Sequence, residues 1–153
     1  MVEIDQSGKL EQLNTGTAVA FSNGESAAVW LSAGVKRQVA LRLRKTLIPS
    51  HDLWAILFAI VIFLMTEELG ADATMRIDEE YTGKEEVIKE VLEKLLIRKL
   101  GSKWVGSIRF GRIGKESEAH KLCWYVHREK NRQKVRSLKA EDILKLLEIK
   151  SRA

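Results

Sequence analysis

The stretch of residues 17–31, TAVAFSNGESAAVWL, indicates the kind of fold most directly. Its two halves, residues 17–21 and 26–31, are rich in Val, Ala, Phe and Trp, a composition typical of strands. Between them lies Asn23-Gly24, the strongest short signal for a tight β-hairpin. We therefore predict two antiparallel strands, preceded by a first strand over residues 1–5 that ends in an acid.

The segment after the hairpin predicts one more strand and a long apolar helix. Large apolar residues at 39, 41 and 43 alternate with Ala40, Arg42 and Arg44, which favours a strand, and a helix from Val35 is the alternative. Pro49-Ser50 then opens a helix that we expect to run to about Leu69, before Gly70. Because this helix is apolar nearly all round, we expect it to be sandwiched inside the domain or to meet another subunit in a homodimer.

Strands and helices alternate in the rest of the chain. Residues 73–78 predict a strand, and Thr82 is expected to cap a helix with apolar residues at helical spacing. A strand over residues 105–113, a helix over 116–130 and a short amphipathic helix over 138–150 follow. This order predicts an α/β fold, with a mixed sheet flanked by helices.

Composition and charge narrow the class of protein. The net charge is +5, but residues 101–153 hold fourteen Lys and Arg against six Asp and Glu, which is +8. This asymmetry favours a polyanionic partner, and a generally charged surface is the alternative. The lone Cys123 excludes an internal disulfide and a cysteine-based zinc site, so we expect a cytoplasmic protein. The longest apolar run has thirteen residues, too few to cross a membrane, so no membrane partner is expected.

Two acids follow predicted strands, at the place where α/β sheets usually bind ligands. Asp5 ends the first strand and Asp78 ends the strand over residues 73–78. If these strands are parallel neighbours, the two carboxylates lie close together and a divalent cation would offset their repulsion. Each aspartate taken alone also suits an ordinary turn. Asp52 and an acid near Glu116 add to the pattern of four acids on alternating elements.

These segments resemble the ribonuclease H-like superfamily, which includes ribonucleases H, Holliday-junction resolvases and related transposases. Residues 2–9, VEIDQSGK, are similar to the opening strand, although Gln6 stands where type 2 enzymes have Glu. Residues 51–56, HDLWAI, are similar to the start of the long helix, with Asp52 in place of Glu. Residues 75–78, MRID, resemble the fourth strand, and residues 115–129 resemble the final helix.

The resemblance implies a ribonuclease H-like mixed five-stranded sheet over residues 1–130, with residues 131–153 as a basic extension that ends in a short helix. It implies a hydrolase, an endonuclease that cuts an RNA/DNA hybrid or structured DNA or RNA. In this class two Mg²⁺ or Mn²⁺ ions activate water and stabilise the leaving oxygen. The alternative is a non-catalytic nucleic-acid-binding protein with a degenerate fold of this kind.

The resemblance also implies site residues. The metal ligands would be Asp5, Asp52, Asp78 and Glu116, with Glu118 as the alternative fourth acid. His120 is a candidate proton shuttle or a structural histidine. Basic residues are the candidate nucleic-acid contacts: Lys9, Arg42, Arg44, Lys115, Arg128, Lys130, Arg132, Lys134 and Arg136. Trp124 and Tyr125 are predicted to pack in or beside the core, with base stacking as the alternative.

Overall fold

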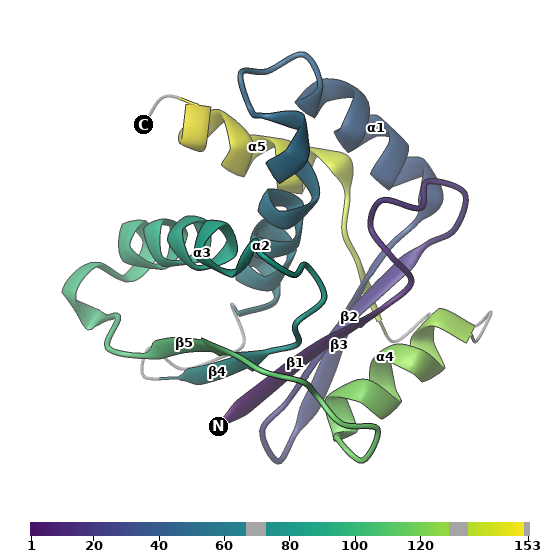
Figure 1. Ribbon diagram of the computed structural model, residues 1–153, viewed down its shortest axis with the longest axis vertical. Coiled ribbons are helices and arrows are strands. Elements are labelled where there is room, and N and C mark those ends of the chain that lie inside the picture. Colours follow the sequence, from purple (N-terminus) through teal and green to yellow (C-terminus); the bar gives the residue numbers. More distant parts are fainter. Residues whose placement is uncertain (67–72, 129–134, 152–153) are drawn as a thin grey trace.

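A computed structural model describes residues 1–66, 73–128 and 135–151 of the chain (Figure 1). Its centre is a six-stranded mixed sheet with the strand order β5-β4-β1-β2-β3-β6. The strands are β1 (Val2–Ser7), β2 (Thr17–Ser22), β3 (Ser26–Leu31), β4 (Thr74–Ile77), β5 (Ser107–Phe110) and β6 (Arg136–Ser137).

The first three strands form the antiparallel part of the sheet, as the hairpin signal predicted. β1 pairs with β2, and β2 pairs with β3 across the Asn23-Gly24 turn. On the other side of β1, strand β4 runs parallel to it, with Ile4 opposite Ile77, and β5 runs parallel to β4. The condition on which the closeness of Asp5 and Asp78 depended, that their strands are parallel neighbours, is therefore met.

Helices cover the two faces of the sheet unequally. The helices are α1 (Ala33–Leu43), α2 (Leu53–Met65), α3 (Glu85–Leu100), α4 (Glu118–Arg128) and α5 (Ala140–Ser151), with short 3-10 turns at Ser50–Asp52 and Gly101–Lys103. Along β2, Val19 belongs to the main core with α2, whereas Ala18 and Ala20 pack against Cys123 of α4. Because neighbouring side chains of a strand point to opposite faces, α4 and α2 lie on opposite sides of the sheet, as Figure 1 shows.

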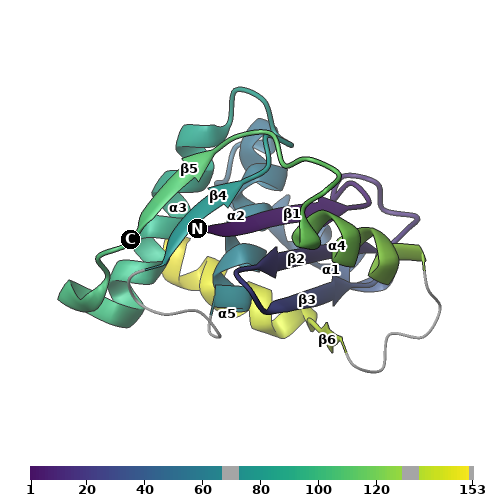
Figure 2. The ribbon, with the colours of Figure 1, turned by 90° about the horizontal axis from the view of Figure 1, so that it is seen from below.

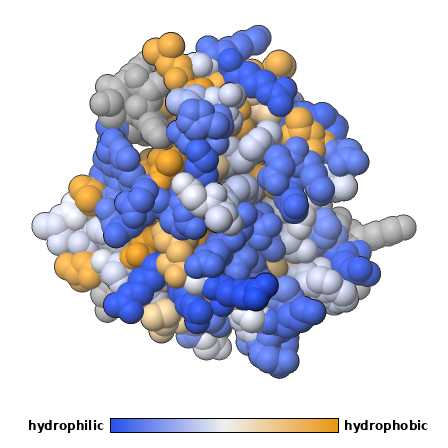
Figure 3. Space-filling model, in the orientation of Figure 1, coloured by the Kyte–Doolittle hydropathy of each residue, from blue (hydrophilic) through white to orange (hydrophobic). Residues whose placement is uncertain are grey.

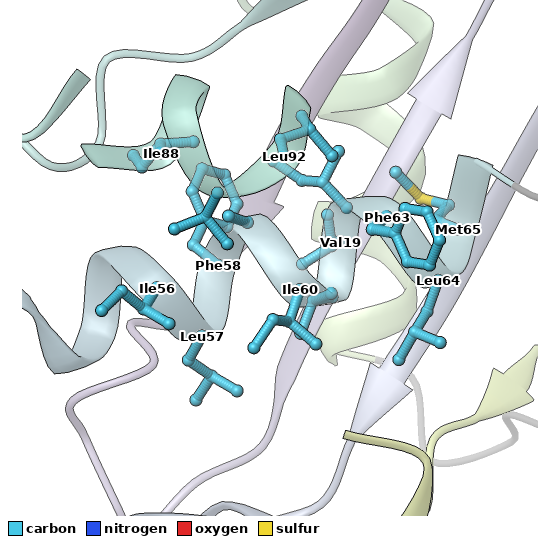
Figure 4. Close-up of a cluster of buried hydrophobic side chains, with 14 of the residues drawn as sticks. Val19, Ile56, Leu57, Phe58, Ile60, Phe63, Leu64, Met65, Ile88 and Leu92 are labelled. Atoms are coloured by element: carbon cyan, nitrogen blue, oxygen red, sulfur yellow. The ribbon is translucent and has the colours of Figure 1, made fainter. Parts of the chain in front are cut away.

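Helix α2 forms the centre of the main core. All its residues except Trp54 are buried, and Figure 4 shows Phe58, Ile60 and Phe63 among side chains of α3 and β2. The helix is therefore sandwiched within the chain, the first of the two alternatives, and its apolar surface gives no support for a homodimer. None of the helices in the described residues has both the length and the apolar character needed to cross a membrane.

The prediction of a strand over residues 39–44 is wrong, because this segment belongs to helix α1. The Ser32 side chain accepts a hydrogen bond from the Val35 backbone N–H at 3.2 Å and caps the helix. Val39 and Leu43 then face the core one turn apart, while Leu41 is 58% exposed. The alternation over these six residues is thus part of the pattern of a helix with one buried side.

Several predicted boundaries also shift. Helix α3 begins at Glu85 after Lys84, later than a cap at Thr82 would give, and β5 is shorter than residues 105–113. The predicted helix end at Leu69-Gly70 lies outside the described residues.

The C-terminal segment adds to the same core. The sheet has six strands instead of the predicted five because β6 pairs in parallel with the edge strand β3. Ile143 and Leu147 of α5 are buried in the main core, where α5 packs against α1 and α2. Residues 135–147 therefore pack as part of the main body of the domain.

Candidate functional site

Asp5 and Asp78 lie side by side on the face of the sheet that carries α4. The Asp78 backbone N–H donates to the Ile4 carbonyl at 3.0 Å, so the parallel ladder continues one step beyond Ile77. Ile4 and Ile77 face the main core, and the alternation of side chains therefore turns Asp5 and Asp78 to the other face. Neighbouring strands are about 4.8 Å apart, which places two like charges next to each other.

Helix α4 brings a third titratable group to this pair. The Nδ1 atom of His120 lies 2.8 Å from Oδ2 of Asp5, while Oδ1 of Asp5 accepts the Gln6 backbone N–H at 2.8 Å. The Asp5 side chain is 5% exposed and that of His120 is 32% exposed. The histidine thus links a buried carboxylate to the surface of the protein.

Loop backbone fixes the second aspartate. Oδ1 of Asp78 accepts the Ile113 backbone N–H at 2.9 Å. The same loop is joined to the sheet by a hydrogen bond from the Gly111 N–H to the Ile77 carbonyl at 3.1 Å. The segment between β5 and α4 therefore holds the Asp78 carboxylate beside β1.

The surroundings of the site raise the pKa of two of its carboxyl groups, Asp5 and Glu80, above the ordinary values. Burial raises the pKa of Asp5, and the neighbouring Asp78 charge raises it further, against the hydrogen bond from His120, which lowers it. Burial also raises the pKa of Glu80, which interacts with Asp78. Such shifts are common where a site is arranged to hold cations or to transfer protons.

Gln6 stands where the resemblance to type 2 ribonucleases H implies a glutamate. Its side chain belongs to the α2 side of the sheet, where its Nε2 donates to the Tyr81 hydroxyl at 3.2 Å. The Tyr81 ring packs against Phe58 of α2. Gln6 thus helps to hold the segment after β4, which carries both Asp78 and Glu80. Sequence reasoning did not select Glu80 or Tyr81, although the acidic triplet at 78–80 was the available signal.

Asp52, a predicted metal ligand, is placed at the start of α2, on the opposite face of the sheet from α4. Its Oδ1 atom accepts a hydrogen bond from Lys84 Nζ at 2.9 Å, an ion pair that joins the beginnings of α2 and α3. His51 Nε2 lies 3.6 Å from its other oxygen. The structure brings Asp52 to Lys84, the residue before α3, whereas it brings His120 to Asp5.

Glu116 and Glu118, the alternative fourth acids, lie at the start of α4. Both line a shallow cavity of about 600 Å³ together with Glu3 and the turn between β2 and β3. Glu118 also forms an ion pair with Lys121 at 3.4 Å. His120, four residues after Glu116 and two after Glu118, is the α4 residue whose side chain contacts Asp5.

We compared the donor set with what a divalent metal needs. Across residues 1–66, 73–128 and 135–151, no group of three or more His, Cys, Asp or Glu side chains is arranged to hold a metal ion. The Asp5 and His120 side chains are turned toward each other by their hydrogen bond. Carboxylate oxygens and an imidazole nitrogen are nonetheless suitable ligands for Mg²⁺ or Mn²⁺, and the repulsion between Asp5 and Asp78 favours a cation.

The predicted nucleic-acid contacts are spread over several parts of the molecule. Arg42 and Arg44 lie at the end of α1, Lys9 follows β1, and Lys115 precedes α4, all of them exposed. Arg136 donates to the Leu64 carbonyl at 3.1 Å. Lys130, Arg132 and Lys134 lie outside the described residues.

The aromatic pair on α4 is at the surface. Trp124 is 49% exposed and Tyr125 is 55% exposed. Both residues therefore lie beside the core with about half of each side chain exposed to solvent. The Arg128 guanidinium lies over the Trp124 ring, 4.8 Å from its centroid. Trp124 is one helical turn beyond His120.

Comparison of the chain with protein-family models, with curated proteins and with solved structures gave no match. The fold, an α/β domain with a six-stranded mixed sheet, and the geometry around Asp5 therefore carry the functional argument.

Proposed function

We propose that the protein is a metal-dependent nuclease with a ribonuclease H-like fold, which hydrolyses phosphodiesters of an RNA/DNA hybrid or of structured DNA or RNA. The observation that carries the proposal is the adjacency of Asp5, within β1, and Asp78, directly after β4, on two parallel neighbouring strands. Three antiparallel strands, then helices, then a parallel strand ending in an aspartate follow the order that the resemblance implies. Both aspartates belong to the motifs on which that resemblance rests.

In this proposal Asp5 and Asp78 hold Mg²⁺ or Mn²⁺, which would activate water and stabilise the leaving oxygen. His120 is the first additional group to consider because it already contacts Asp5. Asp52 and Glu116 are the other two proposed ligands. To reach the metal, Asp52 would have to leave Lys84, and Glu116 would have to leave the cavity that it lines with Glu3.

His120 is suited to move the proton of the reaction. If Nδ1 of the neutral ring donates its proton to Asp5, Nε2 is left as a proton acceptor. The oxygen of the attacking water forms the new bond to phosphorus, and its proton passes to Nε2. The bond to the leaving sugar oxygen breaks, and that oxygen takes the electron pair and is then protonated by the imidazolium or by solvent.

The exposed Trp124–Arg128 pair supports a nucleic-acid substrate. Aromatic rings with a nearby arginine stack on bases of any sequence, and Trp124 lies one turn from His120. A base next to the reacting phosphate could thus rest on α4.

A direct test is to incubate the protein with labelled RNA/DNA hybrid, single strands and four-way junctions, with Mg²⁺, with Mn²⁺ or with EDTA. We expect cleavage that requires the metal and is abolished by Asp78→Asn. Glu79→Gln is the matched control, because Glu79 is the exposed neighbour of Asp78 and its substitution should leave the rate unchanged. If no substrate is cut with either metal, the nuclease proposal is wrong.

The second candidate is a nucleic-acid-binding protein of the same fold without catalysis. Two hydrogen bonds favour it, one between Asp5 and His120 and one from Gln6 to Tyr81. In both, a side chain at a position that the resemblance assigns to metal binding is bonded to another protein side chain instead. Salt-sensitive binding of the same nucleic acids without any products would support this candidate.

A further inference from the structure

A pair of arginines occupies the sheet next to the pair of aspartates. Arg76 of β4 and Arg109 of β5 stand opposite each other in the parallel ladder. Their strand neighbours Met75, Ile77 and Ile108 are buried in the main core, so both arginines point to the face that carries Asp5 and Asp78. Sequence reasoning did not select them, because only the register makes them neighbours.

This face is open above β4 and β5. Helix α4 packs against β1, β2 and β3. Figure 2, which is seen from that side, shows α4 in front of β1 and β2, with none of the described helices in front of β4 and β5. Arg109 is exposed and Arg76 is half-buried. Both guanidinium groups can therefore meet a partner that approaches the sheet.

The protein holds Arg76 in a defined position. Its Nη2 donates to the Arg112 carbonyl at 3.1 Å. The guanidinium also lies directly over Gly111, where a Cβ atom would come within 2.7 Å of Arg76 Nε. Gly111 thus provides the space in which this side chain rests.

Two like charges on adjacent strands destabilise a sheet unless an opposite charge joins them. Arg109 makes no hydrogen bond or ion pair with any residue in the described part of the chain. Glu3 is the neighbour of Arg76 on β1, but no ion pair links these two side chains among the residues described. Figure 3, in the orientation of Figure 1, shows a side of the molecule a quarter turn from the view of Figure 2, and hydrophilic residues predominate there with apolar ones scattered among them. The arginine pair thus suits an anionic ligand better than an apolar one.

We propose that Arg76 and Arg109 form a phosphate anchor for the nucleic-acid strand whose reacting phosphate lies at Asp5 and Asp78. The inference rests on the proposed function and adds the path of the substrate, over the open face of β4 and β5. Arg76 lies two residues before Asp78, which is about 6.6 Å along the strand. One nucleotide rises about 3.4 Å along a helix, so the anchor suits a phosphate one or two nucleotides from the reacting one.

The test measures binding in EDTA, so that it does not depend on the metal or on cleavage. Fluorescence anisotropy with a labelled single strand and a labelled hybrid is recorded over a series of salt concentrations for Arg76→Gln, Arg109→Gln and the double variant. Each single substitution should weaken binding on the order of tenfold, the lower end for a hydrogen bond to a charged group. For the single strand, the slope of log K against log salt should become shallower by about 0.7 for each arginine.

Two further variants separate the anchor from general charge and from misfolding. Lys94→Gln removes an exposed charge from α3, on the other face of the sheet, and should leave both the affinity and the slope nearly unchanged. Gly111→Ala keeps both arginines but displaces the Arg76 guanidinium, so it should weaken binding with a smaller change of slope. Circular dichroism and thermal unfolding check that every variant is folded.

The outcomes separate the anchor from the nuclease proposal. If the wild type binds and folded arginine variants bind equally well with the same slope, the anchor is wrong, whatever cleavage shows. If the wild type binds neither probe, the anchor is also wrong. If the arginine variants bind weakly while the wild type cleaves nothing with Mg²⁺ or Mn²⁺, the anchor is supported and the nuclease proposal fails.

Discussion

His120 of α4 and Asp5 of β1, 115 residues apart in the sequence, are joined by a 2.8 Å contact between Nδ1 and Oδ2. This contact joins helix α4 to the first strand of the sheet. It also gives a buried carboxylate a hydrogen-bond partner that lowers the pKa of Asp5, against burial and the Asp78 charge, which raise it.

Replacing His120 with alanine should raise the pKa of Asp5. The hydrogen bond and the charge of His120 both lower that pKa at present, while burial and Asp78 raise it. Without the histidine, only the Gln6 backbone N–H would still favour the ionised form. Carbon-detected NMR titration of the Asp5 carboxyl measures the change, and Lys121→Ala on the same helix is the control. An unchanged Asp5 pKa in His120→Ala would mean that the two groups do not interact in solution.

Asp78→Asn should stabilise the fold at neutral pH. The new amide oxygen can still accept the Ile113 N–H, while the repulsion of Asp5 is lost. We expect a gain of about 1 kcal/mol in the free energy of unfolding at pH 7, a fraction of the full Coulomb energy of such a pair. Urea unfolding measures it, with Glu79→Gln as the control.

The pH dependence of the same variant has a defined sign. The folded-state pKa of Asp5 lies above its unfolded value of 3.8, so the folded protein binds this proton more tightly. Stability from this group is present below pH 3.8 and is lost as the pH rises through the raised pKa. The stabilising effect of Asp78→Asn should therefore be larger at pH 7 than at pH 3.5. An equal effect at both values would contradict the repulsion between Asp5 and Asp78.

Lys36→Met should destabilise the protein, because Lys36 is buried and holds the loop between β1 and β2. Its Nζ donates to the Lys9 carbonyl at 3.1 Å, the Gln12 carbonyl at 2.6 Å and the Thr17 hydroxyl at 2.9 Å. Without the Lys36 ammonium group these three acceptors lose their donor, which should lower the free energy of unfolding by about 1 to 3 kcal/mol at pH 7. Chemical denaturation measures the loss, and Lys45→Met, an exposed lysine after α1, is the control.

The same lysine should make stability depend on pH in the alkaline range. Burial lowers the pKa of Lys36 from 10.5 to about 8, against the charge of Glu11, which raises it. The unfolded chain therefore binds this proton more tightly, and the wild type should gain stability over Lys36→Met as the pH rises from about 8 to 10.5. A constant difference between the two proteins over this range would show that the pKa is not lowered.

Leu57→Ala and Leu47→Ala should differ sharply although they change the same atoms. Leu57 is fully buried in α2, whereas Leu47 is fully exposed in the loop before it. We expect a loss of about 2 to 5 kcal/mol for Leu57→Ala and less than about 0.5 kcal/mol for Leu47→Ala. Thermal and urea unfolding measure both. Similar losses for the two variants would contradict the central position of α2.

Local signals in the sequence were reliable where one short segment decides its own structure. Asn23-Gly24 predicted the β2–β3 turn, and the apolar run from Leu53 predicted a fully buried helix. The weak point was residues 39–44, because six residues do not distinguish a strand pattern from one side of a helix. The cap at Ser32, outside that window, was the missed signal.

The candidate site was predictable only in part. The position of Asp78 directly after a strand follows from the sequence, whereas Asp5, expected to end the first strand, lies inside β1, which continues to Ser7. The metal, the substrate and the fourth ligand stay predictions. Asp52 was predicted to be a metal ligand together with Asp5 and Asp78, yet it forms an ion pair with Lys84. This ion pair depends on the packing of α2 against α3. His120 was selected for its chemistry, but nothing local indicated that it contacts Asp5.

The sequence by itself determined several local elements of this protein: the hairpin, the buried helix, and the strand that Asp78 follows. Hydrophobic spacing and turn residues act over a few neighbouring residues, so the sequence of each segment is enough to predict its local structure. Only the tertiary structure decided which strands are neighbours, and with them the Asp5–Asp78 pair, the Arg76–Arg109 pair and the approach of His120. These contacts join residues far apart in the chain, and the common packing of the sheet and its helices sets them.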